Sequence, residues 1–302
     1  MGLAFGRKAQ LYAPMHAAPA VHDVSAHGIR IRFHEMGSGK PLVLIHGFLA
    51  NRHTWDDVLG RLAADFRVVA IDLPGFGESE KPNPSKFKYD FDAFAESVLD
   101  VTAALGLSRV SVGGHGLGGS IALALAARHP SVVENLVLVD PLVYPSRHGL
   151  LLEASALPLV GRLAFKQLYG RSAFHNFFEF YGQESTAPRE RIDQMFSQFG
   201  SPAARESAHA TLMTMLDTRS LVAMLPRIQA RTLVMWGRED EKSPVAHARN
   251  LSRQLTSARL EILSCGHFPH EEKPDEFCAT LREFLAPQTP KPRPAAPRGR
   301  RA

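Results

Sequence analysis

Histidines, aspartates and glycines gather in short motifs, each of which follows an apolar run of this 302-residue chain. The motifs are His46–Phe48, Asp72–Ser79, Gly114–Gly119, Trp236–Asp240 and Cys265–His270. Histidine and carboxylate side chains are the common proton carriers in general acid–base catalysis. The motifs therefore hold residue types that can carry out acid–base chemistry, among them Asp240 and His267 in the last two.

The sequence contains no motif for a metal site or for a dinucleotide cofactor. The chain has no HExxH pattern and no histidine–cysteine cluster with the spacing of metal ligands. The run GHGLGG at residues 114–119 lacks the glycine spacing of a dinucleotide site and the acidic residue that should follow it. We therefore expect neither a bound metal nor a cofactor.

The elements that must position these residues are short apolar runs, rich in β-branched residues. The runs are Pro41–Ile45, Phe66–Ile71, Val110–Val112, Leu136–Val139, Thr232–Trp236 and Leu260–Leu263. Continuous apolar strands of this kind are buried on both faces, which predicts a parallel sheet with helices on each side. Arg30–Glu35 alternates with period 2, which is typical of a half-buried strand.

One long stretch interrupts the alternation of strands and helices. Residues 141–225 contain no clear strand, and they carry 7 of the 18 phenylalanines. We interpret this stretch as a helical insertion in the position of a lid. Its aromatic residues either face a ligand or form the insertion's own small core, and the two roles are compatible.

The formal charge of +5 belongs to the C-terminal tail. Residues 287–302 hold five basic residues and no acid, which leaves 30 basic and 30 acidic residues elsewhere. The tail has neither a nucleic-acid-binding motif nor stacking aromatic residues, so we expect a disordered terminus and no nucleic-acid partner.

No apolar run reaches the ~18 residues that a membrane-spanning helix needs. Two cysteines cannot form a disulfide framework, which favours a cytoplasmic protein.

Taken in order, the motifs resemble the α/β-hydrolase superfamily over residues 21–285. The resemblance implies a mostly parallel sheet flanked by helices, with a helical cap inserted. It also implies roles for the motifs: Asp240 and His267 match the acid and base, and the backbone N–H groups of Phe48 and Leu117 match the oxyanion hole. Asp140 matches a position where some relatives keep an alternative acid, but Asp240 is the better match.

The expected domain limits follow from this resemblance. They are an N-terminal extension at 1–20, a hydrolase core at 21–140 and 226–285, a cap at 141–225 and a disordered basic tail at 286–302.

The departure from the family pattern is at its centre. The family's G-x-S-x-G reads Gly114-His115-Gly116-Leu117-Gly118 here, so glycine occupies the nucleophile position. Neither a shifted register nor Ser120, one helical turn further on, restores a serine at the turn. A covalent serine mechanism is therefore not available to this sequence.

Three explanations remain open. The chain is an engineered Ser→Gly variant, or a natural enzyme in which His267 and Asp240 activate water, or a binding protein without turnover. In the second case, the missing side chain at Gly116 leaves space for the water or substrate. Loss of a triad member need not abolish catalysis, because oxyanion stabilisation and binding alone retain roughly 10³–10⁴-fold acceleration in other triad enzymes.

The resemblance also limits the substrate. The cap-bearing members include esterases, epoxide hydrolases, dehalogenases and carbon–carbon bond hydrolases. Epoxide hydrolases and dehalogenases need a carboxylate at position 116, so ester and carbon–carbon hydrolysis fit Gly116 better. We expect a small, largely apolar ester- or ketone-like substrate and a monomer or homodimer. The residues expected to contact the substrate are His115, Phe174, Phe178 and Phe268.

Overall fold

A computed structural model describes residues 18–145, 154, 157, 161–181 and 189–287. Its eight strands form one sheet in the order β1-β2-β4-β3-β5-β6-β7-β8. The strands are β1 (Ala20–Ala26), β2 (Ile29–Met36), β3 (Lys40–Ile45), β4 (Phe66–Ile71), β5 (Val110–His115), β6 (Val133–Val139), β7 (Arg231–Gly237) and β8 (Ala258–Leu263). Strand β2 pairs antiparallel with both β1 and β4, and all pairs from β4 to β8 are parallel. The expected mostly parallel sheet flanked by helices is confirmed.

Helices connect these strands. They are η1 (Arg52–Trp55), α1 (Asp56–Leu62), α2 (Phe91–Ala104), α3 (Leu117–Arg128), α5 (Gly161–Leu168), α6 (Arg171–Tyr181), α7 (Arg189–Phe199), α8 (Pro202–Met215), α9 (Arg219–Met224), η2 (Leu225–Arg227), α10 (Val245–Gln254), α11 (Pro269–Glu272) and α12 (Pro274–Leu285). None of the described helices is long and apolar enough to span a membrane.

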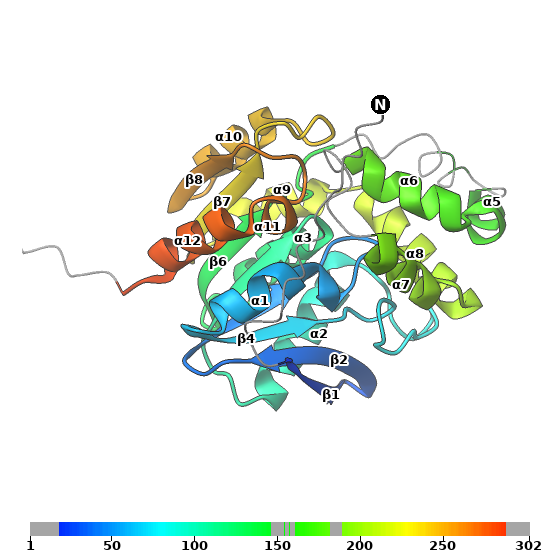
Figure 1. Cartoon of the computed structure of the whole chain (residues 1–302), viewed down its shortest axis with the longest axis horizontal. Coiled ribbons are helices and arrows are strands. Elements are labelled where there is room, and N and C mark those ends of the chain that lie inside the picture. The colour runs from blue at the N-terminus through cyan, green and yellow to red at the C-terminus, as the bar shows by residue number, and fades with distance from the viewer. Residues whose placement is uncertain (1–17, 146–153, 155–156, 158–160, 182–188, 288–302) are drawn as a thin grey trace, which may run out of the picture.

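Alternating side chains of the parallel strands supply two separate apolar layers. On β3, Val43 and Ile45 join the cluster that includes α2 and α3, whereas Leu42 and Leu44 join the cluster with α1 and α12. All four side chains are fully buried. Because successive residues of a strand point to opposite faces, a continuous apolar run fills both layers. Helices therefore cover both faces of the sheet (Figure 1).

Strand β1 is the element that the sequence pattern did not reveal. It pairs with β2 along its whole length, from Ala20 opposite Glu35 to Ala26 opposite Ile29. Most of its side chains are exposed, and only Ala26 is buried. A strand at the sheet edge with so little burial has no apolar alternation to mark it.

Helices α5 to α9 all lie in the chain between β6 and β7, and the described part of that connection contains no strand. Helices α5 to α8 gather beyond one end of the sheet (Figure 1). Helix α9 instead packs against α3. The expected N-terminal extension lies mostly outside the described residues, as does the basic tail beyond residue 287.

Candidate active site

The turn between β5 and α3 brings Gly116 to the carboxyl end of the sheet. Two of its glycines are required by close packing: a Cβ at Gly114 would lie 2.2 Å from the Gly118 carbonyl oxygen, and one at Gly118 would lie 2.2 Å from that of Ile45. Gly116 itself has φ +53° and ψ −115°, a conformation that favours glycine. The backbone therefore forms the sharp strand-to-helix turn on which hydrolases of this kind carry a nucleophile.

The space above Gly116 is open. A Cβ built there would meet only the His267 Nε2 atom at 3.9 Å and the Gly47 Cα atom at 4.0 Å. A serine hydroxyl extends about one bond beyond its Cβ, so the position has room for such a side chain directed at His267. The structure thus places an imidazole where the hydroxyl's base would lie.

His267 is held by Asp240. Its Nδ1 lies 2.6 Å from Asp240 Oδ2, and because an ionised carboxylate only accepts, the ring donates its Nδ1 proton. The other carboxylate oxygen accepts from the backbone N–H groups of Lys242 and Ser243 at 3.0 and 2.8 Å. Burial alone would raise the pKa of Asp240, but His267 and these two N–H groups outweigh it and hold the pKa below its ordinary value. The neutral imidazole then carries its lone pair on Nε2.

A second carboxyl group lies beside this pair. Asp140 follows β6 and is 1% exposed, and its Oδ1 accepts from the Gly237 backbone N–H at 3.1 Å. Burial raises the pKa of Asp140 well above its ordinary value, and the charge of Asp240 raises it further. Asp140 is therefore the neutral acid of the two, and Asp240, not the alternative position, accepts the hydrogen bond from His267.

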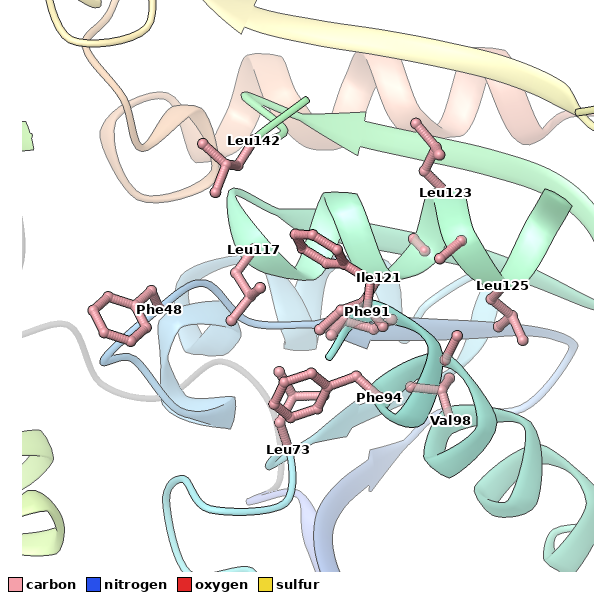
Figure 2. Packing of buried hydrophobic residues seen from close by; sticks show 14 of the residues in the cluster. Phe48, Leu73, Phe91, Phe94, Val98, Leu117, Ile121, Leu123, Leu125 and Leu142 are labelled. Atoms are coloured by element: carbon pink, nitrogen blue, oxygen red, sulfur yellow. The ribbon is translucent and has the colours of Figure 1, made fainter. Parts of the chain in front are cut away.

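Two residues that line the same space, Phe48 and Leu117, have backbone N–H groups with no recorded partner among the described residues. Leu117 begins α3, whose N-terminal end carries partial positive charge. Figure 2 shows Leu117 and Ile121 on one side of α3, facing Phe91 and Phe94 of α2, with Phe48 at the end of this row. An oxyanion hole needs backbone N–H donors of this kind, so the assignment of Phe48 and Leu117 to that role stays a prediction.

His115 is a buried neighbour of this arrangement. Its Nε2 donates to the backbone carbonyl of His267 at 2.8 Å, and its ring lies 5.0 Å from that of Phe268. Burial holds the pKa of His115 well below its ordinary value, and the nearby His267 and His270 lower it further. This neutral ring fixes the main chain that carries the candidate base.

Gly116, His267 and their neighbours line one pocket of about 530 Å³, and Asp240 lies behind His267, outside the lining. Its lining residues are Gly47, Phe48, Ala50, His115, Gly116, Leu117, Asp140, Leu142, Phe177, Met215, Ser243, His267 and Phe268. Apolar side chains dominate this surface away from the catalytic groups. No sequence pattern marks Phe177, Leu142 and Met215 as lining residues, because pocket lining depends on contacts between elements far apart in the chain.

Phe174 and Phe178 do not line the pocket, contrary to expectation. Phe174 is fully buried among aromatic rings of the inserted helices, with Phe199 at 5.3 Å and Phe196 at 5.5 Å. Phe178 stands one turn further along the same face of α6, where its ring lies 6.2 Å from that of Phe268. Phe177 points from another face of α6, and its ring lies 6.0 Å from that of Phe48. Helical spacing groups Phe174 with Phe178, but it does not say which face meets the pocket.

Among the described residues, two groups of side chains have donor atoms close enough together for a metal ion. Asp140, Asp240 and His267 form one of them, within the candidate active site. The other group lies outside the pocket and consists of His34, His53 and Asp56.

Comparison with known proteins agrees with the fold and with the motif order. A family model described as the alpha/beta hydrolase fold matches residues 40–274. The chain is 30% identical over 298 residues to 2-hydroxymuconate semialdehyde hydrolase of Pseudomonas sp. (strain CF600), with 91% of this chain and 96% of that protein covered.

It is also 31% identical over 251 residues to a pimeloyl-[acyl-carrier protein] methyl ester esterase of Neisseria meningitidis, covering 82% of this chain and 93% of the esterase. A solved structure of a bacterial membrane phospholipase A is 30% identical and superimposes with a TM-score of 0.73, covering 89% of this chain and 86% of the other. The chain belongs to the α/β-hydrolase family.

Proposed function

We propose that the chain hydrolyses a small, largely apolar ester- or ketone-like substrate, with an activated water molecule in place of a nucleophilic serine. The supporting observation is the 2.6 Å hydrogen bond that fixes His267 on Asp240 while its Nε2 faces the open space above Gly116. A general base must lie within hydrogen-bond reach of the proton it removes. A water molecule in the space of the missing side chain meets that requirement.

The proposed reaction needs only the substrate and one water molecule. His267 Nε2 takes one proton from water as the oxygen adds to the substrate carbonyl carbon. The resulting oxyanion accepts hydrogen bonds from the N–H groups of Phe48 and Leu117. As the intermediate collapses, the bond to the leaving group breaks, and His267 returns the proton to the departing oxygen or carbon. The products are a carboxylic acid and an alcohol or carbon acid.

The substrate class rests on the pocket and on the relatives. The walls formed by Phe48, Leu142, Phe177 and Met215 suit an apolar group beside a single carbonyl. One relative is named as a hydrolase of 2-hydroxymuconate semialdehyde and another as a methyl ester esterase. We propose that helices α5 to α8 act as the cap that supplies part of this apolar wall, through Phe177 and Met215.

The direct test is replacement of His267 by alanine. Loss of the base should reduce kcat/KM by about 10²–10⁴-fold, which is the usual contribution of a positioned general base. The assay would use short p-nitrophenyl esters and a vinylogous 1,5-diketone, with turnover followed by absorbance. The control is His22→Ala, because His22 lies on the exposed edge strand β1. Unchanged turnover in a folded His267→Ala protein would overturn the proposal.

A second function is favoured by one observation, the absent hydroxyl at Gly116. A pocket with an intact base and oxyanion donors but no nucleophile can also retain a carbonyl ligand without converting it. In that case the wild-type chain would bind such a ligand and show no turnover that depends on His267.

A further inference from the structure

Two histidines and a carboxylate meet on the part of the molecule that holds β2, η1 and α1. The Nδ1 atom of His53 lies 2.9 Å from Asp56 Oδ2, and the Nδ1 atom of His34 lies 3.8 Å from Asp56 Oδ1. The two imidazole rings meet edge to face, with centroids 4.8 Å apart. One donor atom from each residue lies within 4.8 Å of the other two. None of the three residues lines the hydrolase pocket.

The side chain of His34 is buried and has a ring nitrogen that could bind a metal ion. The residue is 4% exposed, and its Nδ1 has no hydrogen-bond partner within the described residues. Burial and the nearby Arg52 lower the pKa of His34 to about 4, so the ring is neutral at physiological pH. A neutral imidazole can offer its lone pair to a metal ion. The Nδ1 atom of His34 therefore lies near the Asp56 carboxylate and the His53 imidazole, and it can coordinate an ion without breaking a hydrogen bond.

The charge around this cluster also allows a cation. Arg52 is a positive group close to His34, and it pairs with two carboxylates: Asp72 at 2.5 Å and Glu78 at 2.6 Å. Asp56 then adds a negative charge that no arginine or lysine is recorded as pairing among the described residues. Arg191 acts on Asp56 only at longer range, and its side chain pairs with the neighbouring Asp57 at 3.0 Å.

We propose that His34, His53 and Asp56 form a binding site for a divalent transition-metal ion, with Zn²⁺ as the best-matched ion. Two imidazoles and one carboxylate are ligands that suit Zn²⁺, and a water molecule completes the tetrahedron. Tetrahedral Zn²⁺ bonds of about 2.0–2.1 Å place ligand atoms roughly 3.3 Å apart. His53 and Asp56 are partly exposed and can close the remaining distance, while buried His34 stays fixed.

The ion would fasten η1 and α1 to the sheet. His34 belongs to β2, whereas His53 and Asp56 belong to the segment that follows the motif His46–Phe48. Asn51 already caps that segment, because its side chain accepts from the His53 backbone N–H at 3.0 Å. Metal binding adds a cross-link between β2 and the loop that carries the Phe48 N–H group. An ion that binds the folded state alone raises the melting temperature.

The test uses the full chain after treatment with a chelator. Titration calorimetry with ZnCl₂ should show one equivalent of tight binding, and thermal unfolding should shift to higher temperature with added ZnCl₂. His53→Gln and Asp56→Asn should each weaken binding by more than ~10-fold, since loss of even an outer-shell partner costs about 10–100-fold in other sites. Both side chains are partly exposed, so these variants should remain folded.

The matched control is His129→Gln. His129 also pairs with a carboxylate, Glu96 at 2.8 Å, but no second histidine is recorded beside it. This variant should keep full Zn²⁺ affinity. Cobalt provides a second readout: the visible absorption of four-coordinate Co²⁺ should disappear in His53→Gln and persist in His129→Gln. The proposal is wrong if the wild-type chain binds no Zn²⁺, or if His53→Gln binds it as tightly as wild type. Neither measurement depends on the hydrolase activity.

Discussion

At the scale of single residues, the absent hydroxyl at Gly116 is the feature that sets this site apart. The surrounding glycines, Gly114 and Gly118, are required by backbone contacts of 2.2 Å, whereas Gly116 has open space around it. The base, its carboxylate and two free N–H donors remain in place. Under the proposed function, these residues are the base, acid and oxyanion donors of a serine hydrolase site that lacks only the nucleophile.

Restoring that nucleophile should create covalent chemistry. In Gly116→Ser, the new Cβ would lie 3.9 Å from His267 Nε2, so the hydroxyl can reach the base. Hydrolysis of short p-nitrophenyl esters should rise by at least ~10²-fold over wild type, because loss of a serine nucleophile costs more than this in other triad enzymes. A fluorophosphonate probe should label the variant, as detected by intact mass.

Gly116→Ala is the matched control, since it adds the same Cβ without a hydroxyl. A folded Gly116→Ser protein that stays inert toward both reagents would contradict this reading of the turn. That outcome would favour the ligand-binding role.

At the scale of elements, two phenylalanines of helix α6 that are three residues apart have different surroundings. Phe174 is fully buried among the aromatic side chains of the inserted helices, and Phe177, three residues later, lines the pocket. A helix turns by about 100° per residue, so neighbouring phenylalanines serve different surroundings.

Alanine substitutions at these two positions should therefore have different effects. Phe174→Ala should lower the free energy of unfolding by about 3–5 kcal/mol, as truncation of a buried phenylalanine does elsewhere. Phe177→Ala should cost less stability and raise KM, or the Kd of a bound ligand, by about tenfold. Urea unfolding measures the first quantity, and steady-state kinetics or calorimetry measures the second. A larger stability loss for Phe177→Ala than for Phe174→Ala would contradict this assignment.

At the scale of the whole molecule, buried histidines link folding to pH. Four of them are neutral in the folded state: burial lowers the pKa of His34 to about 4, that of His270 to about 3, and those of His46 and His115 below their ordinary value. The unfolded chain binds protons at these side chains near pH 6.5, which the folded chain does not do. Stability must therefore fall as pH drops below about 6.5, by up to about 1.4 kcal/mol per group and pH unit.

Glu271 has the opposite effect. Burial raises its pKa to about 7, against the opposing influence of Arg191 and Thr54. The folded chain keeps this proton between about pH 4.5 and 7 while the unfolded chain releases it, so acidification through this window adds stability. Asp140, whose pKa burial also raises, acts in the same direction, so the two carboxyl groups offset about two of the four histidines over the part of the window below pH 6.5.

We expect a net loss of stability between pH 7 and 5.5, measured by urea unfolding in chelator at each pH. The glutamine in Glu271→Gln does not titrate. The free energy of unfolding of this variant should therefore fall more steeply over the same pH range than that of the wild type. A wild-type stability that is constant or rising on acidification would show that the buried histidines do not dominate.

Much of this protein could be read from local sequence pattern. Apolar runs such as Pro41–Ile45 predicted buried parallel strands, because a run that continues through both faces of a strand leaves no exposed side. The order of the motifs indicated the family and located the turn at Gly116. Strand β1 escaped detection because its exposed side chains give no periodic signal.

Tertiary structure decided the contacts between residues that lie far apart in the chain. It placed Asp240 rather than Asp140 on His267, it turned Phe177 rather than Phe174 toward the pocket, and it brought His34 to His53 and Asp56. Sequence spacing says which side chains share a face of one element. Only the packing of one element against another decides what that face meets, because that choice depends on the topology of the whole sheet and its helices. The sequence determined that position 116 carries no hydroxyl, and the fold determined that the imidazole of His267 lies beside that position.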